Sequence, residues 1–210
     1  MNRTKSIFAT VLSLTLLVSC TKKPKDKPVN HGTPSTKLYP ISSGNSWRYE
    51  VTTYDSLNNV TVTTMEDKVV NLTFVMGDTF YKIAAINAYY RSPDDGSTLI
   101  ANSDGQVTTR YQYHNGSDSI QKIGELYIEG YINNYYSRLG TFTYKSYNDC
   151  FCFITQTSDG RDLTWVVYKY LKPGIGIVGV EEFSYSKDAN GQQVYKLYRS
   201  SELKDYFLYP

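Results

Sequence analysis

The sequence contains few of the side chains on which most catalytic and metal centres depend. Its 210 residues include two histidines and three cysteines. Neither His31 nor His114 lies in a metal-binding or nucleophile motif, and neither H-E-x-x-H nor G-x-S-x-G occurs. The sequence therefore predicts a protein that is not an enzyme, with no catalytic residue, no cofactor and no metal ion.

The sequence also lacks an apolar run long enough to span a bilayer. The run from Ile7 to Val18 has twelve residues, whereas a membrane-spanning helix needs about 20. Arg3 and Lys5 precede this run, and small residues follow it. This order of a basic start, a short apolar middle and a small-residue end is typical of a secretory signal. We therefore expect residues 1–19 to be removed.

The four residues at the end of the apolar run are Leu-Val-Ser-Cys at positions 17–20, and they resemble the lipobox of bacterial lipoproteins. The resemblance implies that Cys20 is acylated and becomes the first residue of the mature protein. It also implies a lipid anchor in the bacterial cell envelope, with the outer membrane as the expected site. The periplasmic or surface orientation is left open.

Charge is unevenly distributed along the chain. Loss of residues 1–19 leaves 20 basic and 20 acidic residues, and residues 20–38 then carry a net charge of +4. The same segment has three prolines and few apolar side chains, so it predicts a disordered tether. Residues 39–210 carry a net charge of −4. Nucleic-acid binding is therefore not expected, because it needs a basic surface.

Residues 39–210 are expected to form one antiparallel all-β domain, either a barrel, a half-barrel or a sandwich. Apolar and polar residues alternate in segments such as 47–53, 107–113 and 163–167, as in half-buried strands. Hairpin dipeptides separate the segments. They are Asp95-Gly96, Asp104-Gly105, Asn115-Gly116, Asp159-Gly160 and Asn190-Gly191, with a weaker turn signal at Asn133-Asn134.

Two cysteines remain in the domain, Cys150 and Cys152, in a strand-like segment. Residues two apart on a strand share a face. Three interpretations are open: two small buried apolar residues, a disulfide in an oxidising compartment, or a metal site. The metal site is the least favoured, because no histidine lies nearby and structural zinc takes four ligands.

Two stretches resemble uncharacterised envelope lipoproteins of the Bacteroidota. The first is Tyr39-Pro-Ile-Ser-Ser-Gly-Asn-Ser-Trp-Arg-Tyr49, and the second is Tyr168-Lys-Tyr-Leu-Lys-Pro-Gly-Ile-Gly-Ile-Val178. The resemblance implies an all-β fold and no established chemistry. We expect Trp47 and Tyr49 to be structural. Gly174 and Gly176 are expected to permit a bulge or a close backbone approach.

Tyrosine is abundant, with 21 residues in the chain. A core does not need so many hydroxyl groups, so some rings should reach a rim or a cavity mouth. Tyr111 and Tyr113 are the predicted ligand contacts, and the predicted function is binding of a glycan or an apolar ligand. The alternatives are an envelope scaffold that binds a protein partner and a glycan-acting hydrolase. The expected partners of the protein are the membrane, through Cys20, and a glycan, lipid or protein.

Overall fold

The computed structural model describes residues 37–210 except 85–87, 94–95, 115, 161 and 209–210. The chain divides into two units at residue 33, and all the described residues belong to the second unit. The predicted signal sequence, Cys20 and residues 20–36 of the predicted tether lie outside the described residues. Within the part that is described, no helix is long and apolar enough to span a bilayer.

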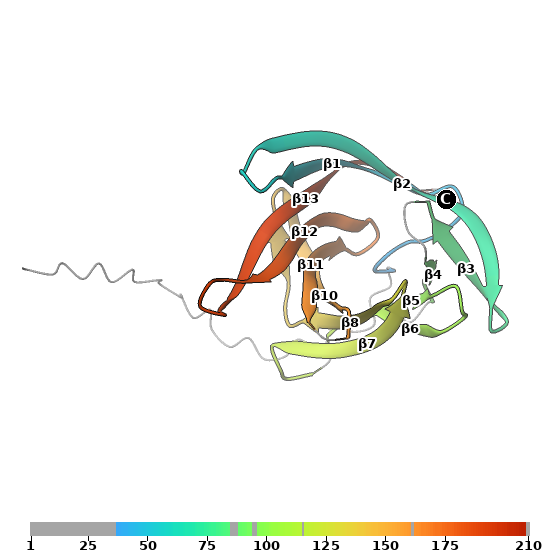
Figure 1. Ribbon diagram of the computed structural model, residues 1–210. Helices are drawn as coiled ribbons and strands as arrows, with labels where there is room; N and C mark the ends of the chain where they lie inside the picture. The colour runs from blue at the N-terminus through green and yellow to red at the C-terminus, as the bar shows by residue number, and fades with distance from the viewer. Residues whose placement is uncertain (1–36, 85–87, 94–95, 115, 161, 209–210) are drawn as a thin grey trace, which may run out of the picture. The chain divides into compact units, whose positions relative to one another are not determined.

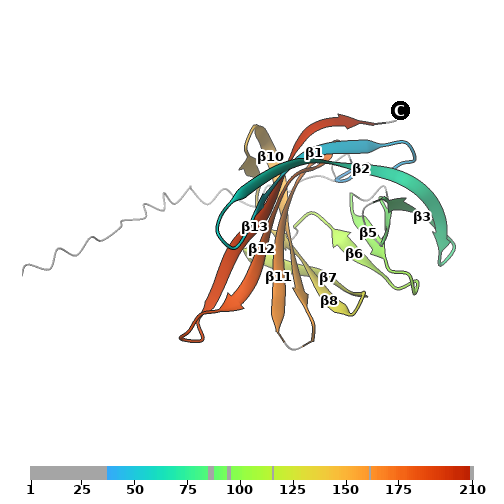
Figure 2. The same ribbon diagram turned by 45° about the horizontal axis from the view of Figure 1, so that its top comes forward.

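The described residues form thirteen strands, which confirms the all-β prediction (Figures 1 and 2). Their bounds are β1 Ser46–Tyr54, β2 Val60–Val75, β3 Asp78–Ile83, β4 Tyr89–Arg91, β5 Thr98–Ala101, β6 Val107–Tyr111, β7 Ile120–Ile128, β8 Tyr131–Arg138, β9 Phe142–Tyr144, β10 Tyr147–Ser158, β11 Leu163–Lys172, β12 Gly176–Lys187 and β13 Gln193–Phe207.

The strands build one curved antiparallel sheet. Its order is β6-β5-β4-β3-β2-β1-β13-β12-β11-β10-β8-β7, and β9 pairs with β10 outside this path. Figure 1 looks roughly along the barrel, with the strands arranged in a ring. The two ends of the order, β6 and β7, come back beside each other, so the sheet is a nearly closed barrel.

The seam between β6 and β7 is joined by single contacts rather than by a ladder of backbone hydrogen bonds. The Glu125 backbone N–H donates to Thr108 Oγ1 at 3.4 Å, and Asn102 Nδ2 donates to the Tyr127 carbonyl at 2.8 Å. A Cβ at Gly124 would lie 2.6 Å from Thr108 Oγ1 and closer still to the Thr109 carbonyl. The seam therefore depends on a residue without a side chain on β7.

Three of the predicted hairpin dipeptides lie in turns between consecutive strands. Gly105, Gly160 and Gly191 have φ values of +80°, +89° and +76°. They connect β5 to β6, β10 to β11 and β12 to β13. The turn prediction is confirmed at these positions, because only a residue without a Cβ adopts this backbone region freely.

The weaker turn prediction at Asn133-Asn134 is wrong. Both residues lie inside β8, where Asn133 pairs with Leu126 and Asn134 pairs with Glu125. The turn that precedes β8 is Glu129-Gly130, where both residues have positive φ. Asparagine favours turns because its side chain can bond to nearby backbone, but the same amide also suits a polar position on the inner face of a strand.

The two lipoprotein-like stretches meet in the barrel core. The Trp47 indole N–H donates to the Ile175 carbonyl at 2.6 Å, and the Tyr49 hydroxyl donates to the Ile177 carbonyl at 3.1 Å. Gly176 has a φ of +101°, and a Cβ there would lie 2.5 Å from the Tyr39 ring. Through these two hydrogen bonds, Trp47 and Tyr49 connect strand β1 to the start of strand β12 inside the barrel.

The domain begins slightly earlier than the predicted boundary at residue 39. Leu38 is fully buried in the core, and the Gly174 backbone N–H donates to the Lys37 carbonyl at 2.9 Å. The composition of residues 20–38 predicts that Leu38 is the last residue of the tether. Its burial depends on the Gly174 turn, which lies more than 130 residues further along the chain.

Candidate ligand-binding cavity

A cavity of about 250 Å³ opens inside the barrel near the turns β7–β8 and β10–β11. Its lining combines aromatic, aliphatic, amide and charged side chains from β4 to β8, β10 and β11, together with the β7–β8 turn. The lining residues are Tyr90, Ile100, Arg110, Ile128, Glu129, Tyr131, Asn133, Tyr135, Thr157 and Lys169. A concave space with a few polar groups is typical of a ligand site.

Two half-exposed aromatic rings lie beside the cavity: Tyr131 lines it, and Trp165 lines a second hollow and contacts the Tyr131 ring. Tyr131 on β8 is 36% exposed, and Trp165 on β11 is 38% exposed. Their ring centroids are 5.8 Å apart in an edge-to-face arrangement. The strand between them, β10, contributes Thr157 opposite Trp165. Because Thr157 is small, the two rings approach each other across the strand, and both remain accessible.

An amide lies directly beside these rings. Thr157 Oγ1 donates to Asn133 Oδ1 at 2.9 Å, and Asn133 Nδ2 donates to the Tyr131 carbonyl at 3.2 Å. Asn133, Thr157 and Trp165 are opposite one another in register, so they share the inner face of the sheet. The edge of the cavity therefore has aromatic faces next to hydrogen-bonding groups.

Arg110 lies deeper in the cavity and is 7% exposed. In the pairing of β5 with β6, Thr98 is opposite Tyr111 and Leu99 is opposite Thr109, so Arg110 is the extra residue of a β-bulge. A bulge interrupts the alternation of side chains and can redirect one of them. Both Arg110 and Tyr111 consequently lie in the interior, where strict alternation would place one of them outside.

The Arg110 guanidinium stacks on an aromatic ring. Its Cζ is 4.1 Å from the Tyr135 ring centroid and 5.4 Å from that of Tyr111. No carboxylate in the described part of the chain lies within salt-bridge distance of Arg110, and its Nε has no hydrogen-bond partner there. Cation–π contacts of this kind are worth up to about 2 kcal/mol when desolvated, which offsets only part of the burial cost.

Lys169 supplies a second cation to the cavity from β11. Its effect is visible at Tyr111, which is buried and whose hydroxyl has no partner that meets hydrogen-bond geometry. Burial alone would raise the pKa of Tyr111. The positive charges of Lys169 and Arg110 outweigh burial, however, and the pKa lies below its ordinary value. The cavity floor is therefore electropositive.

No salt bridge between described residues joins an acidic group to Arg110 or Lys169. Burial raises the pKa of Asp67 despite the opposing effects of Lys169 and Arg199. Glu182 is occupied by Arg199, with Oε1 and Nη1 3.4 Å apart. Glu129 is exposed at the rim.

The predicted ligand contacts, Tyr111 and Tyr113, do not line the cavity. Tyr111 is 1% exposed and packs on Phe153, with ring centroids 5.1 Å apart. Tyr113 follows the end of β6 and packs on Phe151 at 4.7 Å, and burial raises its pKa to about 12. From this strand, Arg110 lines the cavity instead. Direct ligand contact by Tyr111 or Tyr113 stays a prediction.

Cys150 and Cys152 are both buried free thiols. This arrangement corresponds to the first of the three interpretations, two small buried residues. Burial raises the pKa of both thiols, that of Cys152 to about 11. Within the described residues, no group of three or more His, Cys, Asp or Glu side chains is arranged to hold a metal ion.

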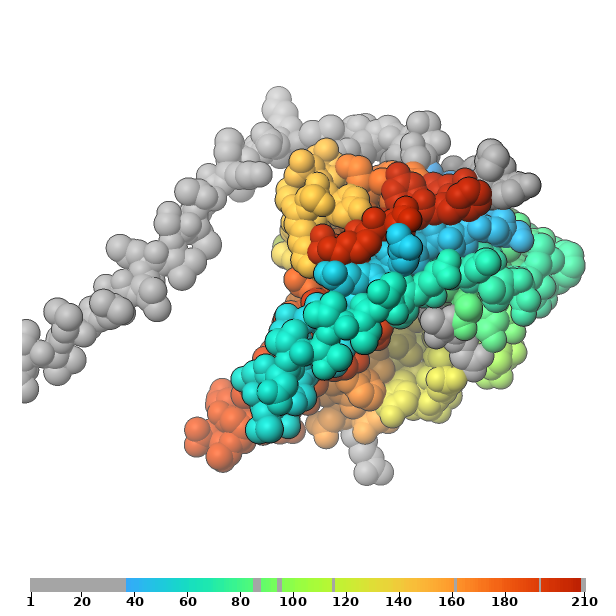
Figure 3. Space-filling view, turned by 90° about the horizontal axis from the view of Figure 1, so that it is seen from above, coloured from blue at the N-terminus to red at the C-terminus, as the bar shows by residue number. Residues whose placement is uncertain are grey.

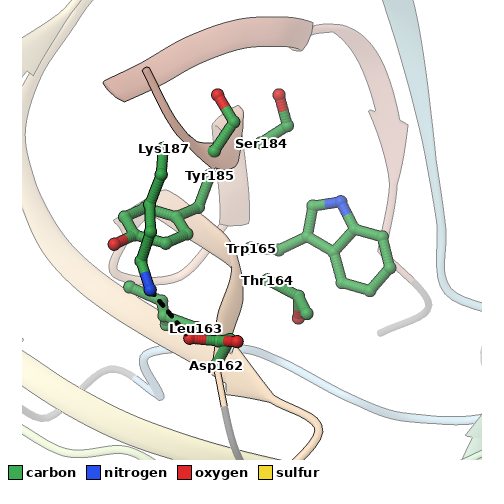
Figure 4. Close-up of a pocket in the computed structure, with 8 residues that line it drawn as sticks. Asp162, Leu163, Thr164, Trp165, Ser184, Tyr185 and Lys187 are labelled. Atoms are coloured by element: carbon green, nitrogen blue, oxygen red, sulfur yellow. Dashed lines mark hydrogen bonds and ion pairs between the residues drawn. The ribbon is translucent and has the colours of Figure 1, made fainter. Parts of the chain in front are cut away.

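A larger hollow of about 450 Å³ lies where β11 begins and β12 ends (Figure 4). Trp165 and Tyr185 point away from each other in this view, and Trp165 pairs with Ser184 rather than with Tyr185. The hollow therefore includes parts of both sheet faces. It offers no single concave surface, and Lys187 and Asp162 form an ion pair across its edge at 3.5 Å.

Exposed apolar side chains gather on the long strand β2, which crosses the face shown in Figure 3. The exposed fraction increases toward the β2–β3 turn, from 46% at Val70 to 72% at Phe74 and 86% at Met76. Scattered exposed apolar residues are ordinary on protein surfaces. A graded series at the end of one hairpin is a candidate contact surface.

Sequence reasoning missed most of the residues that build the cavity. Strict alternation over residues 107–113 predicts that Arg110 lies on the solvent face, and the Asn133-Asn134 signal predicts a turn. The available signal was an arginine flanked by tyrosine and threonine in a strand of mixed polarity. That pattern does not show a bulge, because the bulge is defined by pairing with β5.

The fold and the cavity together define a nearly closed antiparallel β-barrel with a small interior cavity. No protein-family model and no curated protein matches the chain.

Two crystal structures are distantly similar to the chain. A Bacteroides fragilis protein, provisionally described as exported and as having a YmcC-like fold, is 14% identical with a TM-score of 0.44, over 82% of this chain and 100% of its own. A provisionally described lipoprotein of Parabacteroides distasonis is 13% identical with a TM-score of 0.40, over 82% of this chain and 99% of its own. Similarity of this degree says nothing about the ligand.

Proposed function

We propose that the domain is a non-catalytic binding module that holds a saccharide in the barrel cavity. The observation that carries the proposal is the pair of half-exposed rings, Tyr131 and Trp165, beside the Asn133 amide. Aromatic faces suit the apolar faces of sugar rings, and amide groups suit their hydroxyls. The cavity volume of about 250 Å³ is of the order of one sugar ring with its substituents.

Trp165 provides a direct test, because the chain has only two tryptophans. Trp47 is fully buried in the core, whereas Trp165 is 38% exposed and contacts Tyr131, which lines the cavity. A panel of neutral and acidic oligosaccharides should be titrated into the domain while intrinsic fluorescence is recorded. We expect at least one saccharide to change the emission saturably. Trp165→Phe should abolish the change.

Matched variants separate binding from general surface effects. Tyr131→Ala should weaken binding at least tenfold at unchanged stability, because it removes a ring that lines the cavity. Tyr206→Ala removes a similarly exposed ring, 44% exposed, from the far end of β13 and should leave binding unchanged. Equal binding by the Tyr131 variant and the unmodified domain would contradict the proposal.

We further propose that the domain is attached to the cell envelope through a lipid on Cys20. The support is the Leu-Val-Ser-Cys sequence at the end of the apolar leader. Cys20→Ala should leave an uncleaved precursor that incorporates no labelled palmitate. Incorporation of palmitate by this variant would disprove the anchor and would leave the cavity proposal untouched.

A second candidate function is protein interaction through the β2–β3 hairpin. The exposed apolar side chains of Val70, Leu72, Phe74 and Met76 favour it, because apolar contact is typical of interface centres. Leu72→Asp combined with Phe74→Asp should then abolish co-purification of a partner from envelope extracts. Saccharide binding should survive in that variant, since the hairpin does not line the cavity.

A further inference from the structure

Two cations, Arg110 and Lys169, line the cavity. Arg110 is 7% exposed, and neither it nor Lys169 forms a salt bridge within the described chain. A buried charge without a counter-charge is costly, by several kcal/mol per ion. Proteins retain such charges where a ligand supplies the opposite charge, as perturbed groups cluster at functional sites.

The two cations reach the cavity from opposite sides of the seam. Arg110 comes from the bulge in β6, and Lys169 comes from β11. The Tyr111 hydroxyl, which does not line the cavity, is buried and lies close enough to both cations for them to lower its pKa. An arginine side chain offers a planar set of donors, and a lysine offers a compact charge. Both groups donate hydrogen bonds, so together they match an oxygen-rich anion.

The surrounding charges do not change this conclusion. On the strands packed against the pair, Asp67 is buried and its pKa is raised, Glu182 is bonded to Arg199, and Glu129 is at the exposed rim. Burial therefore makes the Asp67 carboxyl harder to ionise than an exposed carboxyl.

We propose that the cavity binds the anionic substituent of an acidic saccharide, a carboxylate or a sulfate ester, at Arg110 and Lys169. This inference rests on the proposed function and specifies its ligand class. The sugar ring contacts Tyr131 and Trp165, and its oxyanion points inward. Arg110 binds the oxyanion through its guanidinium, the geometry that favours two-point contact.

The experiment measures thermal unfolding of the folded domain with three simple probes: galacturonate, galactose 6-sulfate and galactose. Each is used at the same millimolar concentration and at an ionic strength matched with sodium chloride. A ligand that binds the native state alone raises Tm. We expect at least one acidic probe to raise Tm by about 3–11 °C more than galactose does. This is the shift expected for a domain of this size when the probe is present at roughly tenfold to hundredfold its Kd.

Variants test whether the additional rise in Tm with an acidic probe depends on the two cations. Arg110→Gln and Lys169→Met should each abolish it, and both remove a charge that has no acidic partner. Arg48→Gln removes an arginine on the outer surface, paired with Asp205 at 3.0 Å, and should keep the excess. Comparing galacturonate with galactose 6-sulfate shows whether the carboxylate or the sulfate is preferred.

The possible failures are distinguishable. If galactose raises Tm as much as the acidic probes, or if Arg110→Gln keeps the full excess, the anion site is disproved while saccharide binding stands. If no saccharide on the panel changes either Tm or Trp165 fluorescence, the proposed function is disproved together with the anion site.

Discussion

The Trp47 indole N–H donates to the Ile175 carbonyl at 2.6 Å, across 128 residues of sequence. This bond joins the first strand of the barrel to the turn before β12. Tyr39 packs on the Trp47 ring at 4.9 Å and fills the space above Gly176. The bond therefore depends on a chain path at Gly176 that no other residue type adopts easily, since φ there is +101°.

Gly176→Ala should destabilise the domain strongly. The added Cβ meets the Tyr39 ring at 2.5 Å and the Trp47 Nε1 at 3.3 Å, and the positive φ adds about 1–2 kcal/mol of strain. We expect the free energy of unfolding, measured with urea, to fall by more than about 3 kcal/mol, because overpacking adds to the backbone strain. Gly191→Ala is the control: its φ is also positive, but no atom lies within 4 Å of the added Cβ. An equal loss of stability in both variants would show that the Tyr39 ring moves aside to make room for the added Cβ.

Gly124→Ala should open the seam between β6 and β7. The new Cβ would overlap the Thr109 carbonyl and the Thr108 side chain, and overpacking of this kind typically costs about 1–3 kcal/mol. Hydrogen exchange should become faster at β6 and β7 than at β1 and β13. Gly116→Ala is the matched control, because its nearest neighbour is a movable side chain at 3.4 Å. Uniform exchange rates in Gly124→Ala would argue against a weak seam.

Leu38 should contribute to stability although it was assigned to the tether. Leu38→Ala leaves a cavity in the core and should cost about 2–5 kcal/mol, measured by urea unfolding. Lys37→Ala keeps the backbone carbonyl that accepts from Gly174 and should cost much less. If a chain that begins at residue 40 is as stable as one that begins at residue 37, the packing of Leu38 is not needed.

The two domain cysteines should react slowly with thiol reagents in the folded state. Burial raises the pKa of Cys152 to about 11 and also raises that of Cys150, and the thiolate is the reactive form. At pH 8 we expect both thiols to be titrated only after urea is added. Intact mass without reductant should correspond to two thiols. A mass lower by two hydrogens would instead show a disulfide between them.

Asp67→Asn should stabilise the domain at neutral pH. Burial raises the folded-state pKa of Asp67, so the folded state binds this proton more tightly than the unfolded state does. The stability of the unmodified domain therefore falls as pH rises from the unfolded pKa, about 3.9, through the raised folded pKa. Above that window the variant should be the more stable of the two, because the amide carries no charge that must be buried.

The pH profile distinguishes this effect from an ordinary loss of charge. Below the unfolded pKa, Asp67→Asn and the unmodified domain should have equal stability, because the carboxyl is then protonated in both states. Asp205→Asn removes a carboxylate that is 63% exposed and should change stability by less than about 1 kcal/mol at any pH. A neutral-pH loss of stability in Asp67→Asn would mean that the attraction of Lys169 and Arg199 exceeds the burial cost.

Local sequence patterns predicted the all-β class because they depend on near neighbours. Alternation marked strands, and the glycines at 105, 160 and 191 marked turns through their backbone freedom. Trp47 and Gly176, which the sequence predicts to be structural, lie in contact with each other in the core. The predicted anchor at Cys20 also follows from a local pattern, a leader followed by a cysteine. Cys20 itself lies outside the described residues.

The cavity required the tertiary structure, because it is built from side chains that are distant in sequence. Alternation assigns faces only while the register is unbroken, and the bulge at Arg110 exists only in the pairing of β6 with β5. The same limit applies to Asn133, whose place on the inner face is set by its pairs on β7 and β10. Sequence alone determined that this chain makes strands and turns. Closure of the barrel decided which charges lie inside it, since long-range pairing fixes which way each side chain points.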